Sequence, residues 1–543
     1  MSNPMFRVKS VEQSMADTDE PDTKLRKDLT SWDLTVFGVA VVVGAGIFTL
    51  TARTAGNVAG PAVSLAFVLA AIACGLAALC YAEFASTVPV AGSAYTFSYA
   101  TFGEFIAWII GWDLILEFAL AASVVAKGWS HYLNEFICLI VDRDPSTTTY
   151  TVISFGNGDG TGAFESFDWG SVLLIAVLTT LLVLGTKISS MVSLVFTAIK
   201  VSVVLLVIVV GLFYISPKNY SPYIPPSEST EAAASGLHQT LFSLMTGAGN
   251  STYGWYGLLA AASLVFFAFI GFDVVATTAE ETKDPQRSLP RGILGSLAIV
   301  TVLYVGVTLV LTGMVNYTKL KGDSATLATA FRDHGITWAQ WLIIIGALAG
   351  LTTVVMVMLL GQTRVAFAMA RDGLFPRGLA KTGSRGTPVR ITLIVGGVSA
   401  FLAGFLPIGE LEEMVNIGTL FAFVLVCVGV VVLRRTRPDL KRGFRVPLVP
   451  LVPILAVLAC AWLMINLSAF TWIRFIIGWS SVSSSTSPTA RGTRSSACAS
   501  GWSCPVTTNR HPPRTSRRRS SSTRRPWRSR RTRIPQADRA AII

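Results

Sequence analysis

The sequence has few charged residues, and this scarcity excludes the commonest classes of protein. Only 14% of its 543 residues are charged, whereas 52% are hydrophobic and the mean hydropathy is +0.58. A soluble globular chain carries about 25% charged residues, and a disordered chain lacks the hydrophobic content found here. For most of its length the sequence therefore predicts a protein of the lipid bilayer.

Residues that build metal centres, disulfide frameworks and nucleotide sites are scarce as well. The chain has four histidines, and none of its seven cysteines belongs to a C-x-x-C pair. We therefore expect small buried thiols and no metal site. No P-loop of the form G-x-x-x-x-G-K-[ST] is present, which argues against ATP-driven pumping by this chain. No catalytic set of acids or metal ligands lies within the apolar runs, so we expect neither an enzyme nor a cofactor.

The net positive charge lies entirely at the end of the chain. From Gly478 onward there are 14 arginines, no lysine and one acid, Asp538, which accounts for the formal net charge of +13. The rest of the chain is neutral, so we expect no nucleic-acid partner. The Ser- and Arg-rich tail, 479–543, is typical either of a disordered basic arm or of a frameshift product. We favour the frameshift, because rereading GC-rich codons from the third base of codon 479 permits V-V-G-L-V-V-Y-F-A-Y-G, an apolar helix end.

Apolar runs of membrane-spanning length recur through the rest of the chain. A bilayer-spanning helix needs roughly 20 mostly apolar residues, and about twelve such runs are present. The last run is too short to cross as written. The predicted spans cover 34–54, 60–84, 104–127, 169–186, 189–215, 256–279, 291–315, 338–362, 389–407, 414–433, 446–465 and 467–479.

The distribution of Lys and Arg predicts the orientation of these spans. The N-terminal arm, 1–32, and the loops on its side of the membrane contain 21 Lys and Arg, whereas the loops of the opposite side contain seven. Because basic loops stay in the cytoplasm, we place both termini there and predict an even number of spans. The transmembrane domain is predicted over 33–478, in a multi-pass protein of the plasma membrane.

Two of the predicted spans are interrupted near their middle. The first span contains Gly44 and Gly46 on either side of Ala45, and the sixth contains Gly271 and Asp273 within an apolar run. A glycine pair alone favours close helix packing, but interruptions at the first and sixth positions together indicate a transporter binding site. The half-helix that begins near Gly46 would direct its positive end at a carboxylate. Free carbonyls in the second break would receive an ammonium group.

Ionisable side chains inside the spans are candidates for function. Lys200 lies well inside the fifth span with no acid within two turns, so its ammonium must find a partner on another helix or lose its proton. That property suits a proton-coupling residue. Glu117 follows Asp113 by one turn in the third span and needs a partner, for which a water, a hydroxyl and Lys200 are all open. Lys127, at the end of that span, is predicted to be a surface residue.

Distinctive motifs follow one another in order through the predicted domain. They are G-A-G-I-F (44–48), Y-A-E-F (81–84), P-V-A-G-S-A-Y (89–95), G-W-D-L-I-L-E (111–117), F-F-A-F-I-G-F-D (266–273), A-E-E-T-K-D-P-Q-R-S-L-P (279–290) and G-Q-T-R-V-A-F-A-M-A-R-D-G-L-F-P (361–376). Together they resemble the amino acid–polyamine–organocation superfamily and, within it, the bacterial cationic amino acid transporter family.

This resemblance implies an all-α polytopic membrane protein with 12 transmembrane helices in a LeuT-like 5+5 inverted repeat, with helices 1 and 6 broken. Phe267 would close over the substrate, Lys200 would take the place of a sodium ion in proton-coupled relatives, and Glu117 would line the pocket. Relatives often carry Thr or Ser where this chain has Ala45, so one hydroxyl contact is missing. The implied substrate-binding residues are Val42, Val43, Gly44, Ala45, Gly46, Ile47, Phe267, Ala268, Phe269, Ile270, Gly271, Asp273 and Glu117.

The predicted function is secondary active transport of L-amino acids, cationic or small neutral, by alternating access with proton coupling. The alternative is an amino acid or polyamine exchanger without net proton coupling. A channel would need a continuous polar stripe or charged rings, and no span has one. The expected partners are the amino acid, protons and the lipid bilayer, and the sequence does not indicate an oligomeric state.

Resequencing the gene around codon 479 tests the origin of the tail. We expect a missing or extra base relative to close relatives, with the corrected frame restoring a helix and a short basic end. An intact frame, combined with impaired transport after deletion of residues 491–543, would instead establish the tail as a functional arm.

Overall fold

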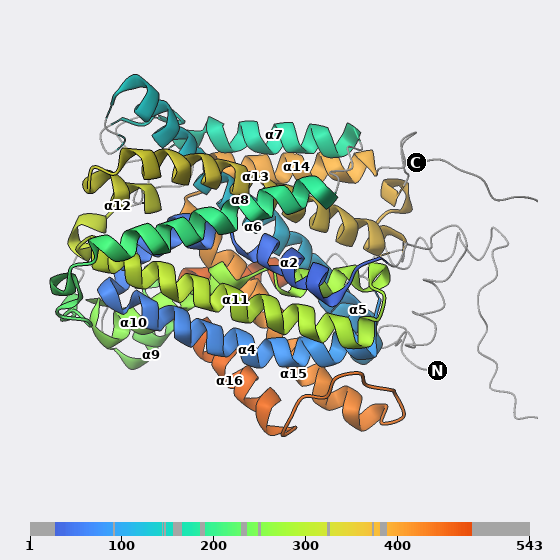
Figure 1. Cartoon of the computed structure of the whole chain (residues 1–543). Helices are drawn as coiled ribbons and strands as arrows, with labels where there is room; N and C mark the ends of the chain where they lie inside the picture. The colour runs from blue at the N-terminus through green and yellow to red at the C-terminus, as the bar shows by residue number, and fades with distance from the viewer. Residues whose placement is uncertain are drawn as a thin grey trace, which may run out of the picture. The chain divides into compact units, whose positions relative to one another are not determined.

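The described part of the chain is a bundle of helices with two short antiparallel strand pairs (Figure 1). The computed structural model describes residues 28–90, 93–143, 145, 148–155, 166–184, 190–229, 236–247, 251–322, 326–371, 374–380 and 388–480. The chain divides into two units, Met1–Arg491 and Gly492–Ile543. The predicted arm up to residue 27 and the tail from residue 481 lie outside the described residues.

Helical residues occur in every predicted span. The α-helices are α2 (Ser31–Val42), α3 (Thr51–Thr54), α4 (Val63–Thr87), α5 (Ser93–Thr101), α6 (Glu104–Val141), α7 (Trp169–Leu184), α8 (Ser190–Gly211), α9 (Leu241–Thr246), α10 (Gly254–Val265), α11 (Pro285–Met314), α12 (Leu327–Asp333), α13 (Thr337–Arg371), α14 (Val389–Phe405), α15 (Ile408–Thr436) and α16 (Leu451–Ile465). A further helix covers 469–480. The π-helical turns are Gly46–Leu50 and Ala55–Ala59, and the 3-10 turns are Gly60–Ala62, Leu212–Tyr214, Pro217–Tyr220, Gly236–His238, Phe266–Phe269, Asp273–Glu281, Tyr317–Leu320 and Arg377–Ala380.

The strands are short and lie in the connections between helices. Strand β1 (Val152–Ser154) pairs with β2 (Ser166–Asp168), which leads directly into α7. Strand β3 (Glu228–Ser229) pairs with β4 (Ser251–Thr252), which precedes α10.

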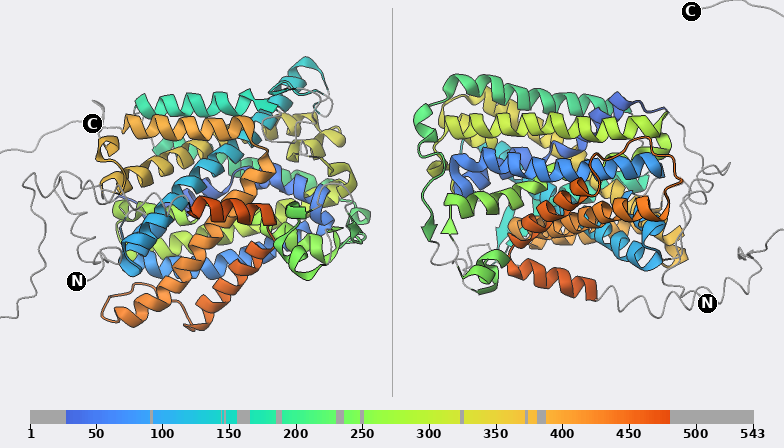
Figure 2. Two further views of the ribbon diagram at one scale, coloured as in Figure 1. Left: turned by 180° about the vertical axis from the view of Figure 1, so that it is seen from behind. Right: turned by 90° about the horizontal axis from the view of Figure 1, so that it is seen from below.

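Seven segments among the described residues are long and apolar enough to cross a membrane. They are Gly46–Thr87, Glu104–Val141, Val195–Tyr214, Gly254–Ala279, Pro285–Met314, Thr337–Ala370 and Ile408–Thr436. Four shorter apolar helices, α2, α7, α14 and α16, accompany them. In Figure 1, α4 runs alongside α11, and α7 alongside α14; both are packed pairs. Figure 2 shows α15 turning back through the 437–450 loop into α16.

Small side chains let α4 pack closely against its neighbours. Ala66, Ala70, Ala73 and Ala77 recur on one face of the helix and are all buried. Because lipid is as apolar as a leucine side chain, helix association in a membrane depends on close packing, and small residues permit it. Helix α4 packs against α10, α11, α15 and α16.

The prediction that Lys127 is a surface residue is wrong. Helix α6 continues to Val141, so Lys127 lies in its interior and its residue exposure is 8%. Its ammonium is 3.8 Å from a carboxylate oxygen of Asp168, and the other oxygen of Asp168 accepts a hydrogen bond from Ser130 (2.6 Å). The sequence misled because Lys127 and Asp168 are distant in the chain and meet only when the residues before α7 pack against α6.

Backbone hydrogen bonds join the start of α2 to the residues just after the sixth predicted span. Leu29 forms a parallel bridge with Thr282, and the amide of Lys283 donates to the carbonyl of Leu29 (3.0 Å). Thr30 then caps α2 in a capping box with Asp33, which satisfies amides that the first turn leaves without partners. These contacts couple the start of the segment that contains the first break to the end of the segment that contains the second.

Glu83 joins α4 to the end of α15 and the loop that follows it. Its two carboxylate oxygens accept hydrogen bonds from Arg434 at 2.8 Å and 2.5 Å, and the amide of Val446 donates at 2.7 Å. Arg442 lies 3.4 Å away. The Glu83 side chain is 4% exposed, and a buried carboxylate is stable only when it is paired and hydrogen-bonded.

Replacing Glu83→Gln should destabilise the protein by about 3 kcal/mol, because the buried guanidinium of Arg442 and the partly buried guanidinium of Arg434 lose their counter-charge. The measurement is the unfolding temperature in detergent, read by a thiol-reactive dye on cysteines that are buried in the fold. Asp439→Asn is the matched control, since its pair with Arg437 is exposed and should contribute little. Equal unfolding temperatures for Glu83→Gln and the wild type would contradict this account of Glu83.

Candidate functional site

The first break lies between α2 and the π-helical turn Gly46–Leu50. Helix α2 ends at Val42, and Val43 is extended, with φ −69° and ψ 94°. The carbonyl of Gly44 then accepts from the amides of Ile47 (3.2 Å) and Phe48 (3.3 Å), which starts the second half of the helix. Backbone groups between the two halves are therefore available to a ligand, as interrupted transmembrane helices allow.

The second break follows the 3-10 turn Phe266–Phe269. Ile270 is extended, and Gly271 has a φ of +117°, a conformation that side chains rarely adopt. A β-carbon on Gly271 would also lie 2.7 Å from a methyl group of Val41. Helical structure resumes at Asp273. Both the backbone conformation and the close approach to α2 require glycine here.

The two breaks contact each other. A β-carbon added to Gly46 would lie 2.3 Å from the β-carbon of Ala268 and 2.5 Å from its α-carbon. The hydroxyl of Tyr304, from α11, lies 2.7 Å from the carbonyl of Val42 and 2.9 Å from that of Ala268. One side chain thus donates hydrogen bonds to carbonyls of both breaks.

Sequence reasoning missed Tyr304, although one signal was present. A tyrosine in the interior of an apolar span must find a partner for its hydroxyl, because an unpaired hydroxyl in hydrocarbon is costly. Nothing in the sequence indicated that the partners would be the two breaks.

Lys200 projects from α8 and is fully buried. Its ammonium donates to the carbonyl of Ala40 and lies 3.5 Å from the hydroxyl of Thr353 on α13. Ala40 is in the last turn of α2, where carbonyls have no amide partner within the helix. The lysine therefore satisfies a carbonyl at the end of α2, directly before the first break. The Glu117–Lys200 pair, one of the alternatives open from sequence, is not formed.

Three acids lie near one another beside the breaks. Asp113 and Glu117 are one turn apart on α6, and Glu117 interacts electrostatically with both Asp113 and Asp273. Glu117 is 2% exposed and Asp273 1%. Neither oxygen of Glu117 accepts a hydrogen bond, and one oxygen of Asp273 also lacks a donor. The hydroxyl of Thr419, which faces Glu117, donates to the carbonyl of Val415 instead (3.0 Å).

The structure places all of the sequence-predicted site residues at or beside these breaks, and all of them are buried. The first break and its flanks contain Val42, Val43, Gly44, Ala45, Gly46 and Ile47; the second contains Phe267, Ala268, Phe269, Ile270, Gly271 and Asp273.

A further ion pair on the first predicted span was also missed. The guanidinium of Arg53, on α3, pairs with the carboxylate of Glu412 on α15. The Glu412 side chain is 2% exposed and that of Arg53 13%. The hydroxyl of Tyr132 also donates to the carbonyl of Phe48 (2.8 Å). These contacts fix the half-helix after the first break to α6 and α15.

Two interrupted helices in contact inside an apolar bundle define a membrane transporter rather than an enzyme. Comparison with known proteins agrees. The model of the amino acid permease family matches residues 29–488. The chain belongs to this family, which is part of the amino acid–polyamine–organocation superfamily, and it is a multi-pass membrane protein.

Individual relatives cover most of the chain. The branched-chain amino acid permease BcaP of Bacillus subtilis (strain 168) is 42% identical over 478 residues, 88% of this chain and 96% of that protein. The methylthioribose transporter of the same organism is 39% identical, covering 87% of this chain and 95% of that protein. The vacuolar cationic amino acid transporter 4 of Arabidopsis thaliana is 36% identical, and the match covers 80% of this chain and 68% of that protein.

Replacing Gly46→Val should abolish binding of a transported amino acid while membrane insertion persists. The added β-carbon would overlap the backbone of Ala268 and separate the two breaks. Binding is measured by scintillation proximity with a radiolabelled amino acid on the purified protein. Gly75→Val is the matched control, because nothing lies within 4 Å of a β-carbon there. Unchanged affinity in Gly46→Val would exclude this site.

Proposed function

We propose that the protein is a proton-coupled secondary transporter of L-amino acids that works by alternating access. The proposal rests on the contact between the two broken helices. Tyr304 donates hydrogen bonds to carbonyls of both breaks, and Lys200 donates to a carbonyl at the end of α2. Ligand-binding backbone at membrane depth, and a lysine held beside it, are what such a carrier needs.

In the proposed substrate complex, backbone amides at residues 44–46 bind the carboxylate. The half-helix that begins at Gly46 adds its positive end. The carbonyls of residues 267–270 accept from the amino group, and Phe267, which is 6% exposed, closes over the substrate. Ala45 offers no hydroxyl, so the carboxylate depends on backbone contacts alone.

The side-chain specificity is proposed to cover small neutral and cationic amino acids. Relatives are named for branched-chain and for cationic amino acids, and one for methylthioribose, so family membership alone leaves a broad range. The carboxylates of Glu117 and Asp273 would suit a cationic side chain, whereas the apolar residues of the two breaks would suit a neutral one.

Alternating access is proposed to work through contacts on either side of the site. The Arg53–Glu412 pair would close the outer side, because it joins the half-helix after the first break to α15. On the inner side, protonated Lys200 would hold α2 in place through the carbonyl of Ala40. Loss of the proton would release α2 and open the cytoplasmic path.

The proposed topology has 12 transmembrane helices in a 5+5 inverted repeat, with both termini cytoplasmic and the protein in the plasma membrane. The breaks fall in the first helix of each predicted repeat, which supports this arrangement. The excess of Lys and Arg on the side of the N-terminal arm supports the orientation. The domain would cover 33–478, between the arm 1–32 and the tail.

Replacing Lys200→Met tests the coupling. The change keeps length and apolar packing but removes the ammonium, so uptake driven by a proton gradient and the pH dependence of binding should both be lost. Uptake of a panel of radiolabelled amino acids into proteoliposomes, with and without a pH gradient, measures this. Lys218→Met is the control, since Lys218 is exposed.

Exchange of internal for external amino acid should survive in Lys200→Met, because exchange needs no net proton movement. Counterflow in the same vesicles measures it and separates a carrier from a channel. If Lys200→Met still concentrates an amino acid with normal pH dependence, Lys200 is not the coupling residue. If uptake by the wild type does not respond to the pH gradient and only exchange of amino acids is observed, the protein is an exchanger.

A further inference from the structure

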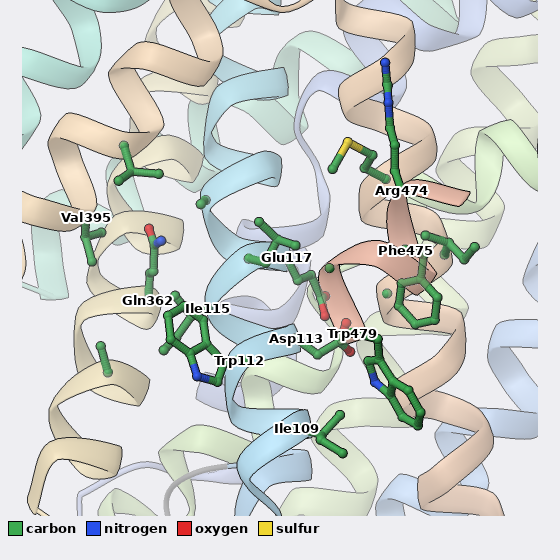
Figure 3. A pocket seen from close by; sticks show the side chains of 18 of the residues that line it. Ile109, Trp112, Asp113, Ile115, Glu117, Gln362, Val395, Arg474, Phe475 and Trp479 are labelled. Atoms are coloured by element: carbon green, nitrogen blue, oxygen red, sulfur yellow. The ribbon is translucent and has the colours of Figure 1, made fainter. Parts of the chain in front are cut away.

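A cavity lies between α6 and the helix 469–480 (Figure 3). Its volume is about 450 Å³, which is ample for a small organic ligand. Among the described residues its lining comes from α6, α13, α14, α15, the segment 374–380 and the helix 469–480. Residues of the two breaks do not contribute to this lining, so the cavity is a separate space that shares only Glu117 with the proposed amino-acid site.

The walls of the cavity are mainly apolar and include aromatic rings. Trp112, Phe375, Phe475 and Trp479 all line it. Several further lining residues are exposed on the outside of the bundle; these are Leu116 (43%), Ile394 (54%) and Val398 (47%). An apolar ligand dissolved in the bilayer could therefore enter from the side.

Two carboxylates lie together on the α6 wall of the cavity. Figure 3 shows Asp113 and Glu117 side by side. Both oxygens of Glu117 and one oxygen of Asp113 have no hydrogen-bond donor. The residue exposure of Glu117 is only 2%. A carboxylate so deeply buried is stable only with a positive or hydrogen-bonding partner.

The basic side chains nearby are already engaged with other groups. Arg474 lines the cavity, but its guanidinium lies 2.8 Å from Glu410 and stacks 4.1 Å from the ring centre of Phe470. Lys200 donates a hydrogen bond to the carbonyl of Ala40. The donors that Asp113 and Glu117 need are therefore best supplied by a ligand.

We propose that this cavity is a second binding site, for a hydrophobic organic amine that has no carboxylate. The ammonium binds between Asp113 and Glu117 in charge-assisted hydrogen bonds, which are about twice as strong as neutral ones. The apolar body packs against Trp112, Phe375 and Phe475. Such a ligand lacks the carboxylate that the first break is proposed to bind, so chemistry as well as position separates the two sites. Glu117 is common to both.

Tryptamine is a suitable probe, with tryptophol, which has a hydroxyl in place of the amine, as its neutral counterpart. Binding is measured by isothermal titration calorimetry on the purified full chain in lipid nanodiscs. We expect tryptamine to bind at least about tenfold more tightly than tryptophol, since hydrogen bonds from an ammonium to a carboxylate are about twice as strong as those from a neutral hydroxyl. Asp113→Asn should reduce that preference for the amine by a similar factor.

A pocket-filling variant separates this site from the amino-acid site. Val398→Trp places an indole in the cavity and should abolish tryptamine binding while amino-acid uptake continues. Leu393→Trp is the matched control, because Leu393 is similarly exposed on α14 (54%, against 47% for Val398) but does not line the cavity. It should bind tryptamine like the wild type. If Val398→Trp fails to take up amino acid, Val395→Phe replaces it, since Val395 also lines the cavity.

Three outcomes would overturn the proposal. One is equal binding of tryptamine and tryptophol, which would mean that the amine is not recognised. Another is full tryptamine binding in a pocket-filled variant that still transports amino acid. The third is the absence of tryptamine binding in a wild-type sample that binds amino acid. Amino-acid uptake in the same preparations tests the proposed transport function separately, so failure of one proposal is distinguishable from failure of the other.

Discussion

Hydrogen bonding of backbone carbonyls at membrane depth is the constraint on which the site depends. Hydrocarbon offers no water, so interrupting a transmembrane helix creates carbonyls that the protein itself must satisfy. Tyr304 meets this need for Val42 and Ala268, and Lys200 meets it for Ala40. The breaks persist because side chains from α8 and α11 take over acceptors that a continuous helix would have used.

The acids inside the bundle are of two kinds, those paired with arginines and those with oxygens that lack a hydrogen-bond donor. Glu83 and Glu412 are buried but paired with arginines, and each joins helices far apart in the sequence. Glu117 and Asp273 are buried and Asp113 is partly buried, and each has at least one oxygen that has no donor. Buried pairs fix one arrangement of helices, whereas acids without donors mark places where a proton or a ligand completes the structure.

The breaks could be predicted because their cause is local. Gly44 and Gly46 in one apolar run and Gly271 in another weaken helices wherever they occur, and an isolated lysine such as Lys200 is conspicuous in a span. The extent of α6 could not be predicted in the same way. The predicted span ended at Lys127, but α6 continues to Val141 and Lys127 pairs with Asp168 within the fold.

The sequence by itself determined a helical membrane protein, the positions of its apolar spans, the two interruptions and the residues beside them. These follow from composition and from periodic or local backbone preferences, which neighbouring residues set. Only the tertiary structure decided that Gly46 contacts Ala268, that Tyr304 joins the breaks, and that Arg53 finds Glu412. It also decided that Glu117 has no lysine partner. Such contacts depend on which helices become neighbours, and one-dimensional patterns do not encode the relative rotation of packed helices.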